Sequence, residues 1–200
     1  MATFRHIPTG KRFLFIHIPR TAGRFIGTNL FENGCKCENG QAHDLWELKN
    51  RVELSHYHRE YYEKYLDVED IPHFAVVRNP IDRFISGMSY HFESSVTVDK
   101  KLLNFIINGY GAVQYFHHFR PQVEFISPKT HIWKYEDGMG KEFVSWLSEL
   151  LGFDFVFKDN AELEYYKPDR QERISKTPHL IEMVREFYKE DFDRFYSSSN

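Results

Sequence analysis

The chain has 200 residues, of which 42% are hydrophobic, 28% are charged and 17% are aromatic. This composition excludes a disordered, collagen-like or coiled-coil chain, and the length is enough to bury a core without disulfides or metals. We expect a single globular domain over residues 1–196 and a disordered tail over residues 197–200, which read Ser-Ser-Ser-Asn. The oligomeric state does not follow from the sequence.

The formal net charge is −3, from 26 lysines and arginines against 29 aspartates and glutamates. This balance disfavours binding to nucleic acid, so any anion site must be local. No apolar run approaches the ~20 residues that cross a bilayer, and residues 1–11 lack the apolar stretch of a secretion signal. We expect no membrane contact and a cytoplasmic location for the chain as given, with a lumenal fragment of a longer protein as the alternative.

The two cysteines, Cys35 and Cys37, are separated by one residue. This spacing makes a mutual disulfide geometrically awkward and favours a reducing compartment. His43 extends the pair to a C-x-C-x5-H string, but a fourth ligand at a suitable spacing is missing. We expect two ordinary loop thiols and no metal.

Two strand–loop–helix units are expected in the first half of the chain. A buried strand over residues 12–18 consists of apolar, β-branched and aromatic residues up to Pro19, and the spacing after the loop predicts a helix over residues 24–31. A second apolar strand over residues 73–77 precedes a helix over residues 80–92, which a proline opens. Two such units predict a parallel sheet.

The second half of the chain is expected to add one strand and several helices. The strand covers residues 130–135, and a helix over residues 141–151 follows and ends at a glycine. Helix-like spacing covers three further stretches, residues 45–65, 101–119 and 178–196. The fold class is therefore α/β, with helices flanking a central parallel sheet.

The loop after the first strand, residues 19–24 (Pro-Arg-Thr-Ala-Gly-Arg), carries the groups that an anion needs. Backbone N–H groups, the positive end of the next helix, the Thr21 hydroxyl and the guanidiniums of Arg20 and Arg24 converge there. Open parallel sheets bind ligands beyond the carboxyl ends of their strands. The Walker spacing is absent, which disfavours an ordinary nucleoside triphosphatase or nucleotide kinase. The loop predicts a site for a phosphate-like group, and solvation by two surface arginines is the alternative.

The end of the second strand repeats this arrangement. Arg78 stands at the strand tip and Ser86 lies two turns into the following helix. Two separated anion sites imply a ligand with two phosphate-like ends. Arg83 lies on a different helical face from Ser86, so we expect it to have a structural role.

Residues 15–23 and 74–86 resemble the two cofactor motifs of sulfotransferases, and the carbohydrate (Golgi-type, chondroitin/heparan-like) branch most closely. In that family a loop of the form I-P-K-T-A-G-T-S holds the 5′-phosphosulfate of PAPS (3′-phosphoadenosine 5′-phosphosulfate), and R-x-P-x-x-R-x-x-S holds its 3′-phosphate. The resemblance continues through residues 117–122, 132–137 and 180–195, and so covers nearly the whole chain. It implies a P-loop-like three-layer fold.

The resemblance also implies an activity, the transfer of a sulfonate group from PAPS to a hydroxyl of an acceptor, a saccharide in this branch, by in-line displacement without a metal. The matching cofactor residues are Arg20, Thr21, Ala22, Gly23, Arg24 and Phe25 for the phosphosulfate, and Arg78 and Ser86 for the 3′-phosphate. Arg20 replaces the family lysine, and Arg24-Phe25 replaces a Thr-Ser pair. Because arginine does not give up a proton, the catalytic help of Arg20 must be electrostatic. The alternative is a catalytically inactive nucleotide- or glycan-binding module on the same fold.

The reaction needs a base for the acceptor hydroxyl, and histidine is the usual choice. The stretch that begins at His43 resembles the segment that carries the proposed base in several carbohydrate sulfotransferases. His56 and His58 resemble the H-x-H pair of the 2-O-sulfotransferases and are the alternative base. Segment 117–122, which holds two histidines, Arg120 and Gln122, is expected to line the acceptor cleft. His17, inside the first strand, is expected to be a core histidine with a hydrogen-bonded ring.

Overall fold

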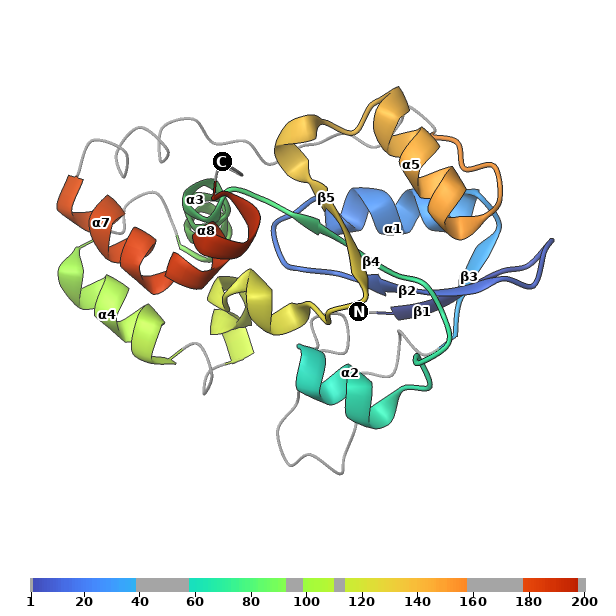
Figure 1. The fold of residues 1–200 in the computed structure, drawn as a ribbon. Helices are drawn as coiled ribbons and strands as arrows, with labels where there is room; N and C mark the ends of the chain where they lie inside the picture. Colours follow the sequence, from blue (N-terminus) through green and yellow to red (C-terminus); the bar gives the residue numbers. More distant parts are fainter. Residues whose placement is uncertain (1, 39–57, 93–98, 110–113, 158–177, 198–200) are drawn as a thin grey trace. The chain divides into compact units, whose positions relative to one another are not determined.

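The computed structural model describes residues 2–38, 58–92, 99–109, 114–157 and 178–197. Their contacts divide the chain into two compact units (Figure 1). Unit 1 comprises Met1–Val77 and Phe125–Glu162, and unit 2 comprises Arg78–Glu124 and Leu163–Asn200. Within the described part of the chain, no helix is long and apolar enough to span a membrane.

Unit 1 contains the sheet, whose strands follow the order β3-β1-β2-β4-β5. The three predicted strands are confirmed as β2 (Arg12–Ile16), β4 (His73–Val77) and β5 (Thr130–Lys134). They are parallel, with β4 between the other two. β1 (Ala2–His6) and β3 (Cys35–Cys37) were not predicted, and they pair antiparallel.

The predicted parallel sheet is therefore confirmed in part: its three predicted strands are parallel, and the two additional strands make the whole sheet mixed. A tight turn joins β1 to β2, closed by hydrogen bonds of 2.8 Å from His6 N to Lys11 O and from Gly10 N to His6 O. Gly10 has φ 73°, which glycine adopts without steric cost. A short hairpin connection of this kind forces neighbouring strands to run antiparallel.

Helices cover both faces of the sheet (Figure 1). α1 (Gly23–Glu32) and α5 (Lys141–Leu151) pack on one face, where their apolar side chains meet alternate residues of β2 and β4 such as Phe15 and Phe74. α2 (Arg59–Tyr65) packs on the other face, and the buried Tyr62 hydroxyl donates to the carbonyl of Phe125 at 3.0 Å. Of the predicted helix 45–65, residues 45–57 lie outside the described residues.

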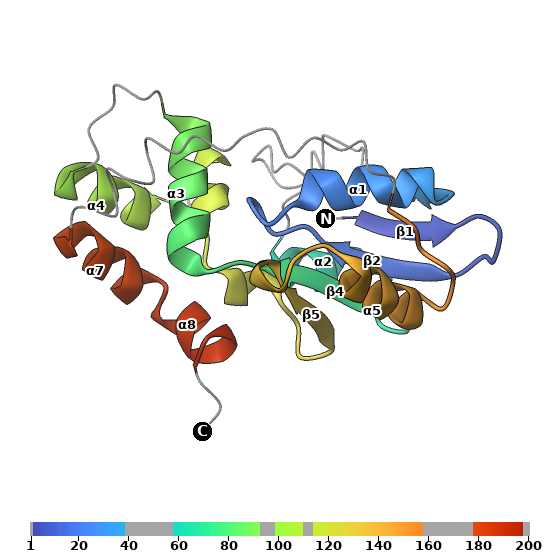
Figure 2. The ribbon, with the colours of Figure 1, turned by 90° about the horizontal axis from the view of Figure 1, so that it is seen from above.

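Unit 2 is helical, and Figure 2 shows α3, α4 and α7 side by side. Its elements are α3 (Pro80–His91), α4 (Lys100–Gly109), the 3-10 helices η3 (Gln114–Phe119) and η4 (Gln122–Phe125), α7 (Pro178–Phe187) and α8 (Lys189–Phe195). The predicted helix 101–119 is thus two elements, and the predicted helix 178–196 changes direction at Tyr188. A buried apolar cluster that includes Phe84, Phe119 and Tyr188 joins them.

The free energy of unfolding at acid pH is expected to depend on the protonation of His73. Its ring is fully buried, with Nε2 2.7 Å from the carbonyl oxygen of Val68 and Nδ1 3.3 Å from the hydroxyl of Ser127. Burial lowers the pKa of His73 below its ordinary 6.5, although the hydrogen bond to Val68 raises it. Below about pH 6.5 the unfolded chain therefore binds a proton that the folded chain does not, and the free energy of unfolding falls.

Urea unfolding between about pH 7.5 and about pH 5 should show this decline in the wild type and a shallower one in His73→Gln, whose side chain does not titrate. A residual slope is expected from His6, whose pKa burial also lowers. Equal slopes in both proteins would show that the His73 ring is not held neutral in the fold.

Candidate functional site

Figure 2 shows the loop that leads from β2 into α1. The backbone of this loop is strained at two positions. Arg20 and Ala22 have φ angles of 69° and 67°, and they are the two non-glycine residues with positive φ in the described ranges. Such a conformation costs about 1–2 kcal/mol per residue. Alternation of positive and negative φ along a loop turns successive N–H groups toward one concavity, which is an anion-binding geometry. Strain of this kind clusters at ligand clamps, so the backbone makes this loop a candidate site.

Thr21 holds the loop closed. Its hydroxyl donates to the carbonyl of Ile18 at 2.8 Å, and the residue is 2% exposed. The expectation that this hydroxyl faces the ligand as a donor is therefore corrected, because its proton is already engaged in the fold. The contribution left to Thr21 at an anion is its backbone N–H.

The first turn of α1 supplies further donors. The N–H groups of the first residues of a helix have no partner within that helix, and the intrahelical bonds of α1 start with Ile26 N and Ala22 O at 3.0 Å. The turn contains the exposed Arg24 and no acidic residue, although the helix dipole favours negative charge there. An anion bound at this end would offset the repulsion between the Arg24 guanidinium and the positive end of the helix dipole. The ring of the half-buried Phe25 packs on Phe157, with centroids 4.7 Å apart.

His17 lies beside this loop, a placement that sequence reasoning missed. β2 ends at Ile16, so His17 lies beyond the strand and is half-buried rather than in the core. Its ring stacks on Phe15 and lies directly against Gly23, where an added Cβ would be 1.8 Å from His17 Cδ2 and 1.9 Å from Nε2. The imidazole therefore touches the first residue of α1, next to the strained loop. The sequence feature that could have indicated this contact is the glycine at position 23, because a residue without a Cβ leaves room for the His17 ring.

Arg78 directly follows Val77, the last residue of β4, and is half-buried. Its backbone is held by the side-chain amide of Gln122: Arg78 N donates to Oε1 and Nε2 donates to Arg78 O, both at 2.9 Å. Gln122 is fully buried, so the expectation that it lines an acceptor cleft is wrong. The half-buried Ser86 lies on α3, in the same unit as Arg78.

Arg83 has a structural role. It is fully buried, its guanidinium donates to the carbonyls of His118 and Arg120, and it lies over the Tyr188 ring at 5.4 Å. Arg120 is 8% exposed and forms an ion pair with Glu124. These two arginines therefore serve the core of unit 2.

Two of the three candidate bases, His43 and His56, lie outside the described residues. His58, directly before α2, is 8% exposed, with Nε2 3.5 Å from a carboxylate oxygen of Glu60 and its ring edge-on to Tyr61. Another histidine of the sequence, His118, has Nδ1 2.7 Å from Nε2 of His91. The choice of base stays a prediction.

Metal and thiol chemistry find no support in the described ranges. Those residues contain no group of three or more histidine, cysteine or acidic side chains that could hold a metal ion. The two cysteines belong to strand β3 and not to a loop. Burial raises the pKa of the Cys35 thiol to about 12, so it is protonated and unreactive.

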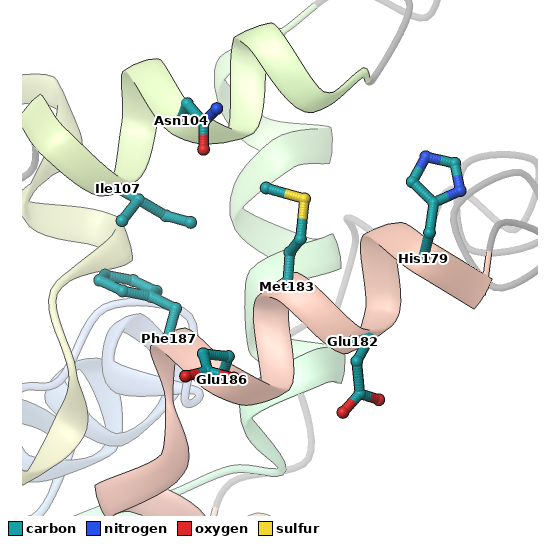
Figure 3. A pocket seen from close by; sticks show the side chains of 7 residues that line it. All are labelled: Asn104, Ile107, His179, Glu182, Met183, Glu186 and Phe187. Atoms are coloured by element: carbon teal, nitrogen blue, oxygen red, sulfur yellow. The ribbon is translucent and has the colours of Figure 1, made fainter.

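A pocket of about 580 Å³ lies in unit 2 between α4 and α7 (Figure 3). Its walls include the apolar side chains of Ile107, Met183 and Phe187, together with the carboxylates of Glu182 and Glu186. None of the residues that are predicted to bind the anion lines this pocket, so it is not the predicted anion site.

Comparison with known proteins adds no assignment: no family model, no curated protein and no solved structure matches the chain.

Proposed function

We propose that the chain is a PAPS-dependent sulfotransferase with a P-loop-like fold, which transfers a sulfonate group to a hydroxyl of an acceptor, a saccharide. The observation that carries the proposal is the strained loop of residues 19–22, with Arg20 and Ala22 at positive φ, which leads from β2 directly into the N-terminus of α1. The parallel order β2-β4-β5 supports the same proposal, because ligands of such sheets bind beyond the carboxyl ends of the strands.

The phosphosulfate is proposed to bind the loop through its N–H groups and the guanidiniums of Arg20 and Arg24. During in-line displacement the bond from sulfur to the 5′-phosphate oxygen breaks and a bond from sulfur to the acceptor oxygen forms. Negative charge then accumulates on the phosphate, and fixed donors and guanidiniums around it lower the barrier. Sulfonate transfer, like phosphoryl transfer, depends mainly on such alignment and charge stabilisation.

The remaining roles follow the resemblance. Arg78 and Ser86 are proposed to bind the 3′-phosphate. His43 is proposed to accept the proton of the acceptor hydroxyl, with His56 or His58 as the alternative base. The reaction needs no metal in this scheme, since the arginines supply the positive charge.

Binding of PAP, the desulfonated product of PAPS, tests the proposal. A ligand that binds only the folded state stabilises it by about 2.7 kcal/mol at a hundredfold excess over Kd. For a chain of this size, that gain corresponds to a rise in Tm of ~5–10 °C. Differential scanning fluorimetry, with calorimetry for Kd, measures both quantities. A wild-type protein that does not bind PAP would refute the proposal.

The role of Arg20 is tested by Arg20→Ala, which keeps the positive-φ penalty of a residue with a Cβ and removes the side chain beyond Cβ, including the guanidinium. Loss of such a charge donor is expected to lower kcat by ~10²–10³-fold. Arg20→Lys restores the charge without the bidentate fork and should keep measurable activity. The matched control is Ala22→Gly, which relieves strain in the same loop without changing its charge. Retained PAP binding without turnover on any acceptor, even in Arg20→Lys, would favour the inactive binding module.

A further inference from the structure

We infer that Gln122 and Asp191 are positioning residues for the Arg78 anion site, and that Gln122 sets the backbone from which the Arg78 guanidinium reaches a 3′-phosphate. The inference rests on the proposed function. All three residues belong to unit 2.

Gln122 acts on Arg78 as an additional strand would. β4 ends at Val77, which is the last residue in register with β5. At the next position the carboxamide takes over, since it accepts from the N–H and donates to the C=O of the same residue. Directly after it, the Asn79 side chain accepts from Ile81 N at 3.0 Å and caps α3. Arg78 is therefore held between a strand and a helix, with both of its backbone polar groups bonded to one buried side chain.

Asp191 holds Gln122 in turn. One carboxylate oxygen accepts from Gln122 N and the other from Val123 N, each at 2.9 Å, and Asp191 is fully buried on α8. Both peptide N–H groups of this segment are thus bound to one rigid acceptor. A second buried side chain, that of Tyr188, donates its hydroxyl to the carbonyl of Phe119 at 2.6 Å. The start of η4, where Gln122 lies, and the end of η3 are thus each fixed by a hydrogen bond to a buried side chain of the C-terminal helices.

The buried, ionised carboxylate of Asp191 orients this segment at a cost in stability. Burial raises its pKa, and this effect exceeds the lowering by the Arg83 charge and by the backbone N–H groups of Gln122 and Val123. Keeping the carboxylate ionised in the fold therefore reduces the stability of the native state at neutral pH. What the ionised group provides is two strong, charge-assisted hydrogen bonds that orient the segment.

The precise placement of Arg78 matters because a guanidinium binds a phosphate through a planar fork. A fork that is displaced or rotated loses one of its two hydrogen bonds, and sites need support around the contacting residue to avoid this. This support consists of the hydrogen bonds from Gln122 N to Asp191 and from the Gln122 amide to the backbone of Arg78.

The experiment compares the affinity for PAP with that for AMP, which lacks the 3′-phosphate, by calorimetry. Gln122→Met keeps the length of the side chain but removes both hydrogen bonds to Arg78. We expect the ratio Kd(AMP)/Kd(PAP) to fall on the order of tenfold, since buried backbone groups of Arg78 lose their partner. The same substitution in an Arg78→Ala background should change the ratio no further, because coupled residues are not additive.

Asn33→Leu is the matched control. In unit 1, Asn33 makes the same two-armed contact with a backbone, since Nδ2 donates to Val156 O and Oδ1 accepts from Val156 N, both at 2.8 Å. Its loss should lower the free energy of unfolding and leave the ratio unchanged. A general loss of stability is thereby separated from a loss of 3′-phosphate recognition.

Gln122→Glu provides a second variant if Gln122→Met does not fold. When ionised, the new carboxylate still accepts from Arg78 N but repels its carbonyl, and when protonated it regains a donor. Burial raises the pKa of a carboxyl, so the ratio should stay near the wild-type ratio while the new group is protonated and fall below it as the pH rises through that pKa. A ratio equal to that of the wild type at the same pH, also where the new carboxylate is ionised, would overturn the inference. A wild-type protein that does not prefer PAP to AMP would instead contradict the proposed 3′-phosphate site itself.

Discussion

Replacement of His43 by alanine is expected to lower kcat by ~10²–10⁴-fold, because the acceptor hydroxyl then loses the group that removes its proton. PAP affinity should change little, since a base contacts the acceptor and not the cofactor phosphates. A base must be neutral to accept a proton, so the wild-type turnover should fall on the acid side near pH ~6.5, the ordinary pKa of histidine. Steady-state kinetics under saturating PAPS, with calorimetric PAP binding, check both expectations.

The controls are His56→Ala and His58→Ala on the same acceptor. His58 contacts Tyr61 and lies near Glu60, so its replacement should reduce stability more than turnover. Near-normal turnover in His43→Ala, together with a collapse in either control, would move the base to the H-x-H pair.

Replacement of Gly23 by alanine is expected to raise the Kd for PAP roughly 10–100-fold, which corresponds to the loss of one charge-assisted hydrogen bond of about 1.5–3 kcal/mol. The new Cβ would lie 1.8 Å from His17 Cδ2, far inside contact distance, so either the ring or the start of α1 must move. Removal of the ring relieves the clash, and the double variant Gly23→Ala/His17→Ala should recover most of the affinity. Calorimetry on both variants measures the loss and the recovery.

Gly27→Ala is the matched control in the same helix, because nothing lies within 4 Å of a Cβ at that position. It should bind PAP as the wild type does and be slightly more stable, since alanine favours a helix interior over glycine by roughly 0.5–1 kcal/mol. Wild-type affinity in Gly23→Ala would remove the loop from the site. A persistent loss in the double variant would show that His17 itself contributes to binding.

The strands and helices of the sheet region were predictable because their signals are local. β4 is five consecutive buried residues, and α5 begins and ends where its spacing and the glycine at position 152 place it. The observed ends of the strand β2 and the helix α1 differ from the predicted ends by one or two residues. The two candidate anion loops were predicted for the same reason, since Arg78 directly follows β4 and Arg20 lies in the loop that follows β2.

The antiparallel strands and the helix breaks were not predictable in this way. β1 becomes a strand because it pairs with β2 and β3, and β3 because it pairs with β1. The three residues from Cys35 to Cys37 carry no periodic signal of their own. η3 and the change of direction at Tyr188 arise where the Phe119 carbonyl and the Tyr188 hydroxyl meet across 69 positions of the chain.

The sequence by itself determined which residues could bind an anion, because arginine, glycine and the strand–loop–helix order are properties of short segments. Only the tertiary structure decided how the two sites are built. A positive φ at Arg20 and Ala22 opposes the preference of each residue, so the surrounding fold must impose it. The amide of Gln122 finds its partner 44 positions away, and a contact over that distance has no local signature. Gln122 was expected to line a cleft, but it is fully buried and supports the backbone of Arg78. A fully buried amide must satisfy its hydrogen bonds within the protein.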